Sequence, residues 1–171
     1  MKRLWSPWRM RYVSNVEDYR KEGCIFCDKP ASGDDAEALI VHRGRTCFIM
    51  LNAFPYNTGH LMISPYRHVG ELEELRSEEY CEMMELAVLA SRAIQAEVHS
   101  QGMNLGMNLG KAGGAGIADH LHMHLVPRWD GDTNFMPVIA EVKVMPETLP
   151  QTHSRLSAAI RRVLEGDAGG A

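Results

Sequence analysis

The chain has 171 residues, of which 45% are hydrophobic and 23% are charged. These values are typical of one globular domain with its own core, and they exclude wholly disordered and fibrous classes of protein. Acidic residues (22) outnumber Lys and Arg (18) and give a net charge of −4. Broad electrostatic binding to nucleic acid is therefore not expected.

The chain carries no pattern of a membrane or export segment. Its longest apolar runs have about six residues, whereas a membrane-spanning helix needs roughly 20. Lys2 and Arg3 are followed by Trp5 and Pro7 rather than by an apolar stretch, so no signal peptide is expected. We therefore predict a cytoplasmic protein without a membrane partner or a disulfide framework.

The first half of the chain predicts an antiparallel pair of strands. Residues 31–38 are polar and are expected to form a solvated loop, and a first strand is predicted at 38–42. Apolar and β-branched residues predict strands at 46–51 and 60–64. The Pro, Asn and Gly residues of 52–59 predict the turn that joins these two strands.

The second half predicts two helices and two further strands. Ser77 is a candidate N-cap, and apolar residues at three- and four-residue steps predict an amphipathic helix from there to about residue 98. Strands are predicted at 103–109 and 120–127, and a second helix at 152–164. This order of elements predicts an α+β protein, and we expect residues 1–171 to form a single domain.

Histidine is the unusual residue type, because three of the eight lie within five residues. Polar and apolar residues alternate here, so a strand would place His120, His122 and His124 on one face. A neutral imidazole with a pKa near ~6.5 can be a nucleophile or an acid–base catalyst at cellular pH. We expect one histidine to attack, one to hold orientation and one to act on the substrate's charge. The alternative is a solvated polar face or a metal-binding tract.

A glycine-rich segment leads into these histidines. Six of the 15 glycines lie within residues 102–116. The spacing is not that of a Walker loop, but such a turn can direct backbone N–H groups at phosphate oxygens. A flexible hairpin is the alternative.

Cys24 and Cys27 have the spacing of metal ligands, but two thiolates make only half of a tetrahedral zinc site. A redox pair would be expected to lead into a helix, and residues 28–30 indicate a loop instead. Cys47 and Cys81 are expected to be small buried apolar residues.

Three segments resemble the histidine triad (HIT) superfamily. They are 59–65 (GHLMISP), Asn108 with the glycine-rich loop, and 120–128 (HLHMHLVPR). The resemblance covers about residues 24–140. The continuation at 129–135 (WDGDTNF), with LWSPWR near the N-terminus, is similar to the bacterial branch that includes diadenosine tetraphosphate phosphorylases.

The resemblance implies a HIT-like fold, with a mostly antiparallel sheet, one long helix and a C-terminal helix. Residues 1–23 and 141–171 would be extensions, and the protein would be a homodimer. It also implies an enzyme that cleaves a nucleoside di- or polyphosphate, most simply diadenosine tetraphosphate, through a covalent nucleotidyl-histidine. The alternative is a nucleotide-binding regulatory module with slow turnover.

The family's functional positions fall on particular residues of this chain. His122 corresponds to the nucleophile, His124 would contact the phosphate and assist the leaving group, and His120 completes the candidate catalytic set. His60 corresponds to a hydrogen-bonded support. The resemblance assigns substrate binding to Asn52 at the ribose and to Asn108, Gly114, Ala115 and Gly116 at the phosphates.

Zinc is the cofactor that the resemblance implies. In several HIT proteins it is held by a cysteine pair and two histidines, which here would be Cys24, Cys27, His68 and His120. One departure concerns the acceptor: many members carry Ser, Thr or Gln in the glycine-rich loop, and this chain has none between Lys111 and Asp119. The sequence therefore leaves open whether phosphate or water releases the nucleotide.

Overall fold

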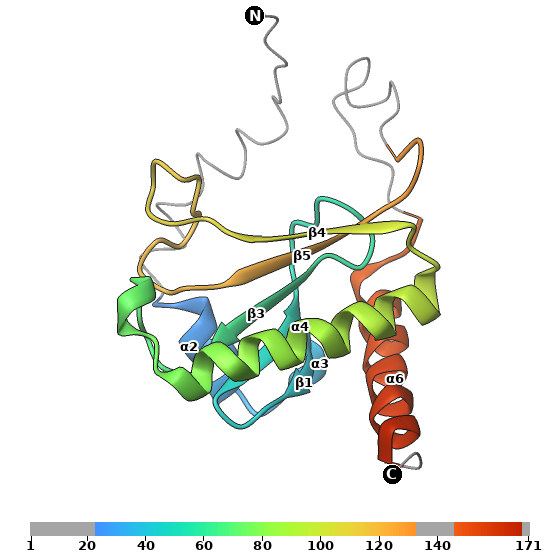
Figure 1. The fold of residues 1–171 in the computed structure, drawn as a ribbon, viewed down its shortest axis with the longest axis horizontal. Coiled ribbons are helices and arrows are strands. Elements are labelled where there is room, and N and C mark those ends of the chain that lie inside the picture. Colours follow the sequence, from blue (N-terminus) through green and yellow to red (C-terminus); the bar gives the residue numbers. More distant parts are fainter. Residues whose placement is uncertain (1–22, 133–145, 169–171) are drawn as a thin grey trace, which may run out of the picture.

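The computed structural model describes residues 23–132 and 146–168, so all but Gly23 of the predicted N-terminal extension lies outside the described residues. It contains a five-stranded sheet with the order β1-β2-β3-β5-β4, and every neighbouring pair is antiparallel (Figure 1). The strands are β1 (Ile40–Arg43), β2 (Cys47–Leu51), β3 (Leu61–Pro65), β4 (Gly102–Met107) and β5 (Met123–Arg128). The predicted α+β class is confirmed.

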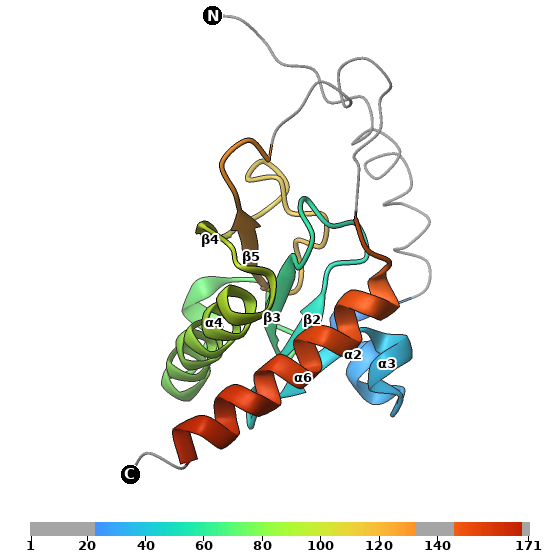
Figure 2. The same cartoon turned by 90° about the vertical axis from the view of Figure 1, so that its right-hand side faces the viewer.

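Two long helices cover one face of the sheet. They are α4 (Ser77–Val98) and α6 (Leu149–Ala168), and Figure 2 shows them packed across the sheet. The main core lies between, where Ile49, Leu61 and Leu125 of the sheet meet Ile94 of α4 and Leu156 of α6. Within the described residues, no helix is long and apolar enough to cross a membrane.

Two short helices cover part of the opposite face. α2 (Ile25–Ala31) and α3 (Asp35–Ala38) contribute Phe26 and Ala38 to a second cluster, with Phe48, Met50 and Met62 from the sheet. A short 3₁₀ helix (Leu72–Glu74) precedes α4. The loop predicted at 31–38 is therefore partly helical. The Asp34 side chain begins α3 by accepting the N–H groups of Ala36 and Glu37, each at 3.0 Å.

The prediction of a loop directly after Cys27 is wrong. Cys24 is the residue before α2 and Cys27 lies inside this helix, which includes Pro30. Pro30 is the sixth of the seven residues of α2, so its missing N–H costs the helix one hydrogen bond close to its end. The expected loop can therefore no longer be used as an argument against a redox pair. The surroundings of the two thiols must decide between a redox pair and a pair of metal ligands.

The histidine run is strand-like for only part of its length. β5 begins at Met123, so His120 and His122 precede the strand. Their segment is fixed by the N–H of buried Leu121, which donates to the Val69 carbonyl at 2.7 Å. This bond places the residue after His68 beside the residue after His120.

Candidate active site and metal centre

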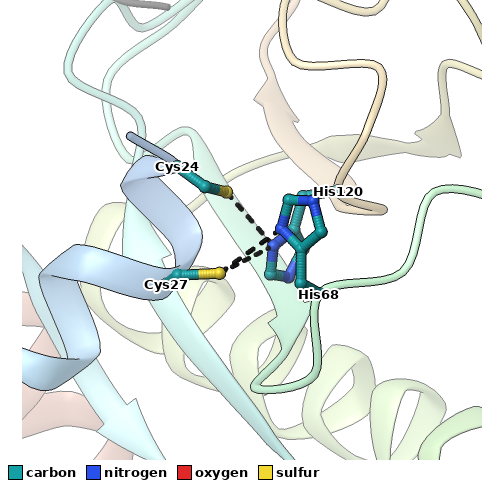
Figure 3. A group of neighbouring side chains, drawn as sticks. All are labelled: Cys24, Cys27, His68 and His120. Atoms are coloured by element: carbon teal, nitrogen blue, oxygen red, sulfur yellow. Dashed lines mark hydrogen bonds between the residues drawn. The ribbon is translucent and has the colours of Figure 1, made fainter. Parts of the chain in front are cut away.

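Cys24, Cys27, His68 and His120 form one cluster, in which one ligand atom of each residue lies within 4.8 Å of the others. The Nδ1 atom of His120 is 3.3 Å from Cys24 Sγ and 3.6 Å from Cys27 Sγ. His68 Nδ1 is 3.4 Å from Cys27 Sγ. Figure 3 shows the sulfurs pointing from α2 toward the two imidazoles. The predicted ligand set is therefore brought together.

The hydrogen bonds around the cluster fit a metal ion. His120 Nε2 lies 2.9 Å from the Pro65 carbonyl, which can only accept, so this nitrogen carries the proton and Nδ1 is left to face the sulfurs. Burial lowers the pKa of His120 to about 4, so its imidazole is neutral at cellular pH, as a ligand must be. Two sulfurs and two imidazole nitrogens are a tetrahedral zinc set.

The segment that carries His68 is held to helix α4. Arg67 donates from Nε and Nη2 to the two carboxylate oxygens of buried Glu79, both at 2.8 Å. Such a two-pronged pair fixes direction as well as distance. These bonds therefore attach the segment that carries the ligand His68 to the long helix α4.

The other two cysteines differ from each other. Cys47 is fully buried in the main core, as predicted. Cys81 is exposed on α4, so the prediction that it is buried is wrong. It lies on the solvent side of the helix, whereas Met83 on the opposite side is buried.

His122 is buried and oriented by the backbone of its neighbour. Its Nδ1 lies 2.9 Å from the His120 carbonyl, so this nitrogen carries the proton and Nε2 keeps its lone pair. Burial lowers the pKa of His122. Phe26 stacks on the ring at 4.6 Å between centroids, with an interplanar angle of 28°. The helix that carries the cysteine pair thus also restrains this imidazole.

His124 is held by a chain of hydrogen bonds that fixes the opposite tautomer. The Tyr56 backbone N–H donates to His60 Nδ1 at 3.1 Å, so the proton of neutral His60 is on Nε2. His60 Nε2 then donates to His124 Nδ1 at 3.0 Å. Neutral His124 therefore carries its proton on Nε2, and its ring meets that of His122 edge-on at 4.9 Å.

Two of the predicted substrate-binding residues, Asn52 and Asn108, lie beside histidines of the site. Asn52 directly follows β2 and begins the turn. Its N–H donates to the His60 carbonyl at 3.0 Å, and its Oδ1 accepts the Phe54 N–H at 2.9 Å. Asn108 and His124 line the same hollow. Asn108 Nδ2 also donates to the Gly114 carbonyl at 3.4 Å.

The glycine-rich loop is closed by its own hydrogen bonds. The N–H of Gly114 donates to Lys111 O at 3.0 Å, and the N–H of Ala115 donates to Gly110 O at 3.2 Å. Gly114 has a φ of +88°, which a residue with a side chain rarely adopts. The predicted role of Gly114, Ala115 and Gly116 at phosphate therefore stays a prediction, and it requires these internal bonds to open.

Sequence reasoning missed two aromatic residues of the site. Phe26 lies between the two cysteines and contacts both His120 and His122. Tyr56 contacts both His60 and His124. Only their positions in the sequence could have indicated them. Phe26 lies between the two cysteine ligands, and Tyr56 lies in the turn before the Gly59-His60 pair.

The comparisons with known proteins agree with this geometry. The family model described as HIT domain matches residues 34–131, more than half of the chain. The chain belongs to the HIT family. AP-4-A phosphorylase of Mycobacterium tuberculosis (strain H37Rv) is 40% identical over 163 residues, which cover 92% of this chain and 83% of that protein. Bis(5'-adenosyl)-triphosphatase of Dictyostelium discoideum is 27% identical over 81 residues, or 47% and 54% of the two chains.

Solved structures confirm the predicted HIT-like fold. A Zn-bound histidine triad family protein from Mycobacterium smegmatis matches with a TM-score of 0.69 and 22% identity, covering 85% of this chain and 98% of that chain. A hypothetical histidine triad nucleotide-binding protein from Sulfolobus tokodaii matches with a TM-score of 0.65 and 24% identity, covering 84% and 93%. At these identities the likeness concerns the fold alone.

Proposed function

We propose that this HIT protein is a nucleotidyl hydrolase or transferase that cleaves diadenosine tetraphosphate at an α-phosphate. One observation carries the proposal: His122 Nδ1 donates to the His120 carbonyl at 2.9 Å, which leaves Nε2 as a nucleophile. The Mycobacterium tuberculosis relative named AP-4-A phosphorylase, which is 40% identical, supports the substrate.

The reaction has two steps. His122 Nε2 attacks the α-phosphorus, an N–P bond forms, and the P–O bond to the leaving ATP breaks, while the His124 Nε2–H donates a hydrogen bond to the leaving oxygen and stabilises its negative charge. Inorganic phosphate or water then attacks the adenylyl group, the N–P bond breaks, its electron pair returns to His122 Nε2, and any proton that the acceptor loses goes to solvent. The products are ATP with ADP if phosphate is the acceptor, and ATP with AMP if it is water.

The remaining predicted residues have binding and positioning roles in this proposal. Asn52 contacts the ribose hydroxyls and Asn108 contacts phosphate. The backbone N–H groups of Gly114, Ala115 and Gly116 stabilise the equatorial oxygens after the loop opens, and such donors are worth about 3 kcal/mol each. His120 acts through its carbonyl, which orients His122, while its ring belongs to the metal cluster.

Zinc has a structural role in the proposal. Cys24, Cys27, His68 and His120 would hold it and leave no open coordination position. The ion would tie α2, and with it Phe26, to the segment of the nucleophile. The cysteine pair is then a ligand pair rather than a redox pair, because two imidazoles face it.

A homodimer is the assembly that we propose. Tyr80, Met84 and Val88 are 42%, 50% and 52% exposed and follow each other at four-residue steps along α4. β4 is an edge strand of the described sheet, and its Leu105 is 48% exposed. A second copy that covers this apolar stripe and pairs with this edge would bury both.

The test of the activity is product analysis with and without inorganic phosphate. Incubation with diadenosine tetraphosphate and phosphate is expected to give ADP and ATP, and AMP with ATP would identify water as the acceptor. The His122→Ala variant is the control and is expected to lose turnover. Tight binding of the nucleotide without any product in the wild type would instead support the regulatory module.

A further inference from the structure

A hollow of about 420 Å³ opens beside His124 on the face of the sheet that carries the histidines. It runs along β5 from His124 past Val126 to Arg128, over β4 and next to Tyr56. The metal cluster lies at the other end of this segment, because it joins the segment at His120, whereas Asn108 at the start of the glycine-rich loop lines the hollow together with His124. From Val126 to Arg128 the hollow therefore extends beyond His124, on the side away from His122.

Strand β4 leaves this space open with a glycine. Gly106 is the register partner of His124, so a side chain there would stand on the same face, next to the imidazole. A Cβ at Gly106 would have no atom within 4 Å. A glycine inside a strand weakens it, and here no protein contact requires one. The missing side chain instead makes room beside the His124 imidazole.

The walls of the hollow suit a nucleoside. Tyr56 is 39% exposed, and its ring lies 6.0 Å from that of His124 at 25°, so it forms an aromatic side wall. Exposed Asn104 offers a carboxamide from β4. The Arg128 guanidinium is paired with Asp132 at 2.8 Å, so its charge is balanced within the protein. Such a lining matches a base and a ribose better than a bare phosphate chain.

The hollow is held in shape by a polar network. Asn57 Nδ2 donates to Asp132 Oδ2 at 2.8 Å and to the Pro127 carbonyl at 3.0 Å. Arg128 Nη1 donates to Asn104 Oδ1 at 2.9 Å. These bonds join the turn before His60, the end of β5 and strand β4. A preformed pocket of this kind loses little entropy when a ligand enters it.

We propose that this hollow binds the second nucleoside of a dinucleoside polyphosphate, the one that departs with the leaving group, and that Gly106 keeps it open. The proposal rests on the proposed function, because it needs His124 to donate its hydrogen bond to the leaving oxygen. The polyphosphate would cross His124, and the departing base would lie along Tyr56. Selectivity for two nucleosides over one would then come from β4 and the turn, not from the histidines.

The experiment compares two substrates that differ only in the second adenosine, diadenosine tetraphosphate and adenosine 5′-tetraphosphate. The Gly106→Val variant fills the hollow with a residue that strands favour, and no neighbour within 4 Å opposes its Cβ. We expect it to reduce the ratio of the two kcat/KM values by about tenfold, the size of one base-stacking contact. Gly102→Val is the matched control, on the same face of β4 but outside the hollow, and should keep the ratio.

An unchanged ratio in Gly106→Val would overturn the proposal, as would an equal fall in Gly102→Val. Circular dichroism and the melting temperature check that both variants are folded. If the wild type turns over neither nucleotide, the proposed function fails, and calorimetric Kd values of the same two ligands still test the subsite. In that case Gly106→Val must weaken binding of diadenosine tetraphosphate selectively, and equal weakening of both ligands would refute the subsite.

Discussion

At the scale of single residues, the site depends on which nitrogen of each imidazole carries the proton. A neutral imidazole offers one donor and one acceptor, and a hydrogen bond on one nitrogen decides the other. The His120 carbonyl leaves a lone pair on His122 Nε2, while His60 leaves an N–H on His124 Nε2. Adjacent histidines of one run are thus prepared for opposite tasks, attack on phosphorus and hydrogen-bond donation to the leaving group.

His60 is accordingly a positioning residue for His124, the hydrogen-bond donor to the leaving group. We expect His60→Phe to lower kcat by up to about a hundredfold with little change in KM, because His124 loses the bond that selects its tautomer. His60→Gln, whose amide N–H can still donate, should recover part of the loss. Steady-state kinetics provide the check. Equal kcat values for wild type and His60→Phe would show that the bond at 3.0 Å does not matter for turnover.

Glu82 is the buried carboxylate on which the start of β2 depends. Burial raises its pKa, but the Thr46 hydroxyl and the N–H groups of Arg45, Thr46 and Cys47 outweigh burial and lower the pKa to about 2. A depressed carboxyl pKa stabilises the fold above pH 4.5, and the contribution disappears as the pH falls toward 2.

Glu82→Gln tests this contribution. We expect the variant to lose about 2–3 kcal/mol of unfolding free energy at pH 7, since the neutral amide replaces an acceptor of several N–H groups. Urea unfolding of both proteins from pH 7 to pH 2.5 measures the difference, which should shrink below pH 4.5. A difference that stays constant with pH would contradict the assignment.

At the scale of elements, α2 links the metal cluster to the nucleophile. It carries Cys27 on one turn and Phe26, which stacks on His122, beside it. The element has only seven residues, so it is too short to be stable without tertiary contacts. Metal binding is therefore expected to order α2 and stabilise the fold.

Elemental analysis tests the metal site. We expect one zinc per chain in the wild type, and loss of zinc in Cys24→Ser and Cys27→Ser together with a lower melting temperature. Cys81→Ser is the control, because this thiol is exposed and outside the cluster. Full zinc content in both ligand variants would refute the site.

Elements with a long repeating pattern could be predicted from the sequence. The helix α4 begins one residue earlier than predicted, because Arg76 rather than Ser77 is its N-cap, and it ends at Val98 as predicted. The strands β2 and β3 match to within one residue. The short helices α2 and α3 could not be predicted, because they are too short to show a repeating apolar pattern and form through their caps and tertiary contacts instead. The zinc ligands were predicted through the family pattern. The roles of Phe26 and Gly106 could not be predicted, because they depend on the stacking of Phe26 on His122 and on the register that pairs Gly106 with His124.

At the scale of the whole molecule, the two faces of the sheet have different tasks. α4 and α6 cover the face that holds the main core, and the histidines lie on the other face with α2. The exposed apolar stripe of α4 (Tyr80, Met84 and Val88) therefore lies on the opposite side of the sheet from the site. An interface at this stripe can be disrupted without changing a catalytic residue.

Light scattering tests the dimer. Met84→Glu places a charge in the middle of the exposed stripe and is expected to convert the dimer into a monomer. Leu164→Glu, at an exposed position of α6, is the control and should leave the mass unchanged. A wild-type protein that is monomeric at all concentrations would contradict the proposed assembly.

The central claim is that His122 carries the nucleotide during turnover. The most direct measurement is the intact mass, and then the peptide mass, of protein quenched in acid-free conditions during reaction with diadenosine tetraphosphate. We predict one adenylyl group per chain, located on His122 and absent from His122→Ala. Rapid product formation by the wild type with no adduct, or an adduct on another residue, would contradict the account.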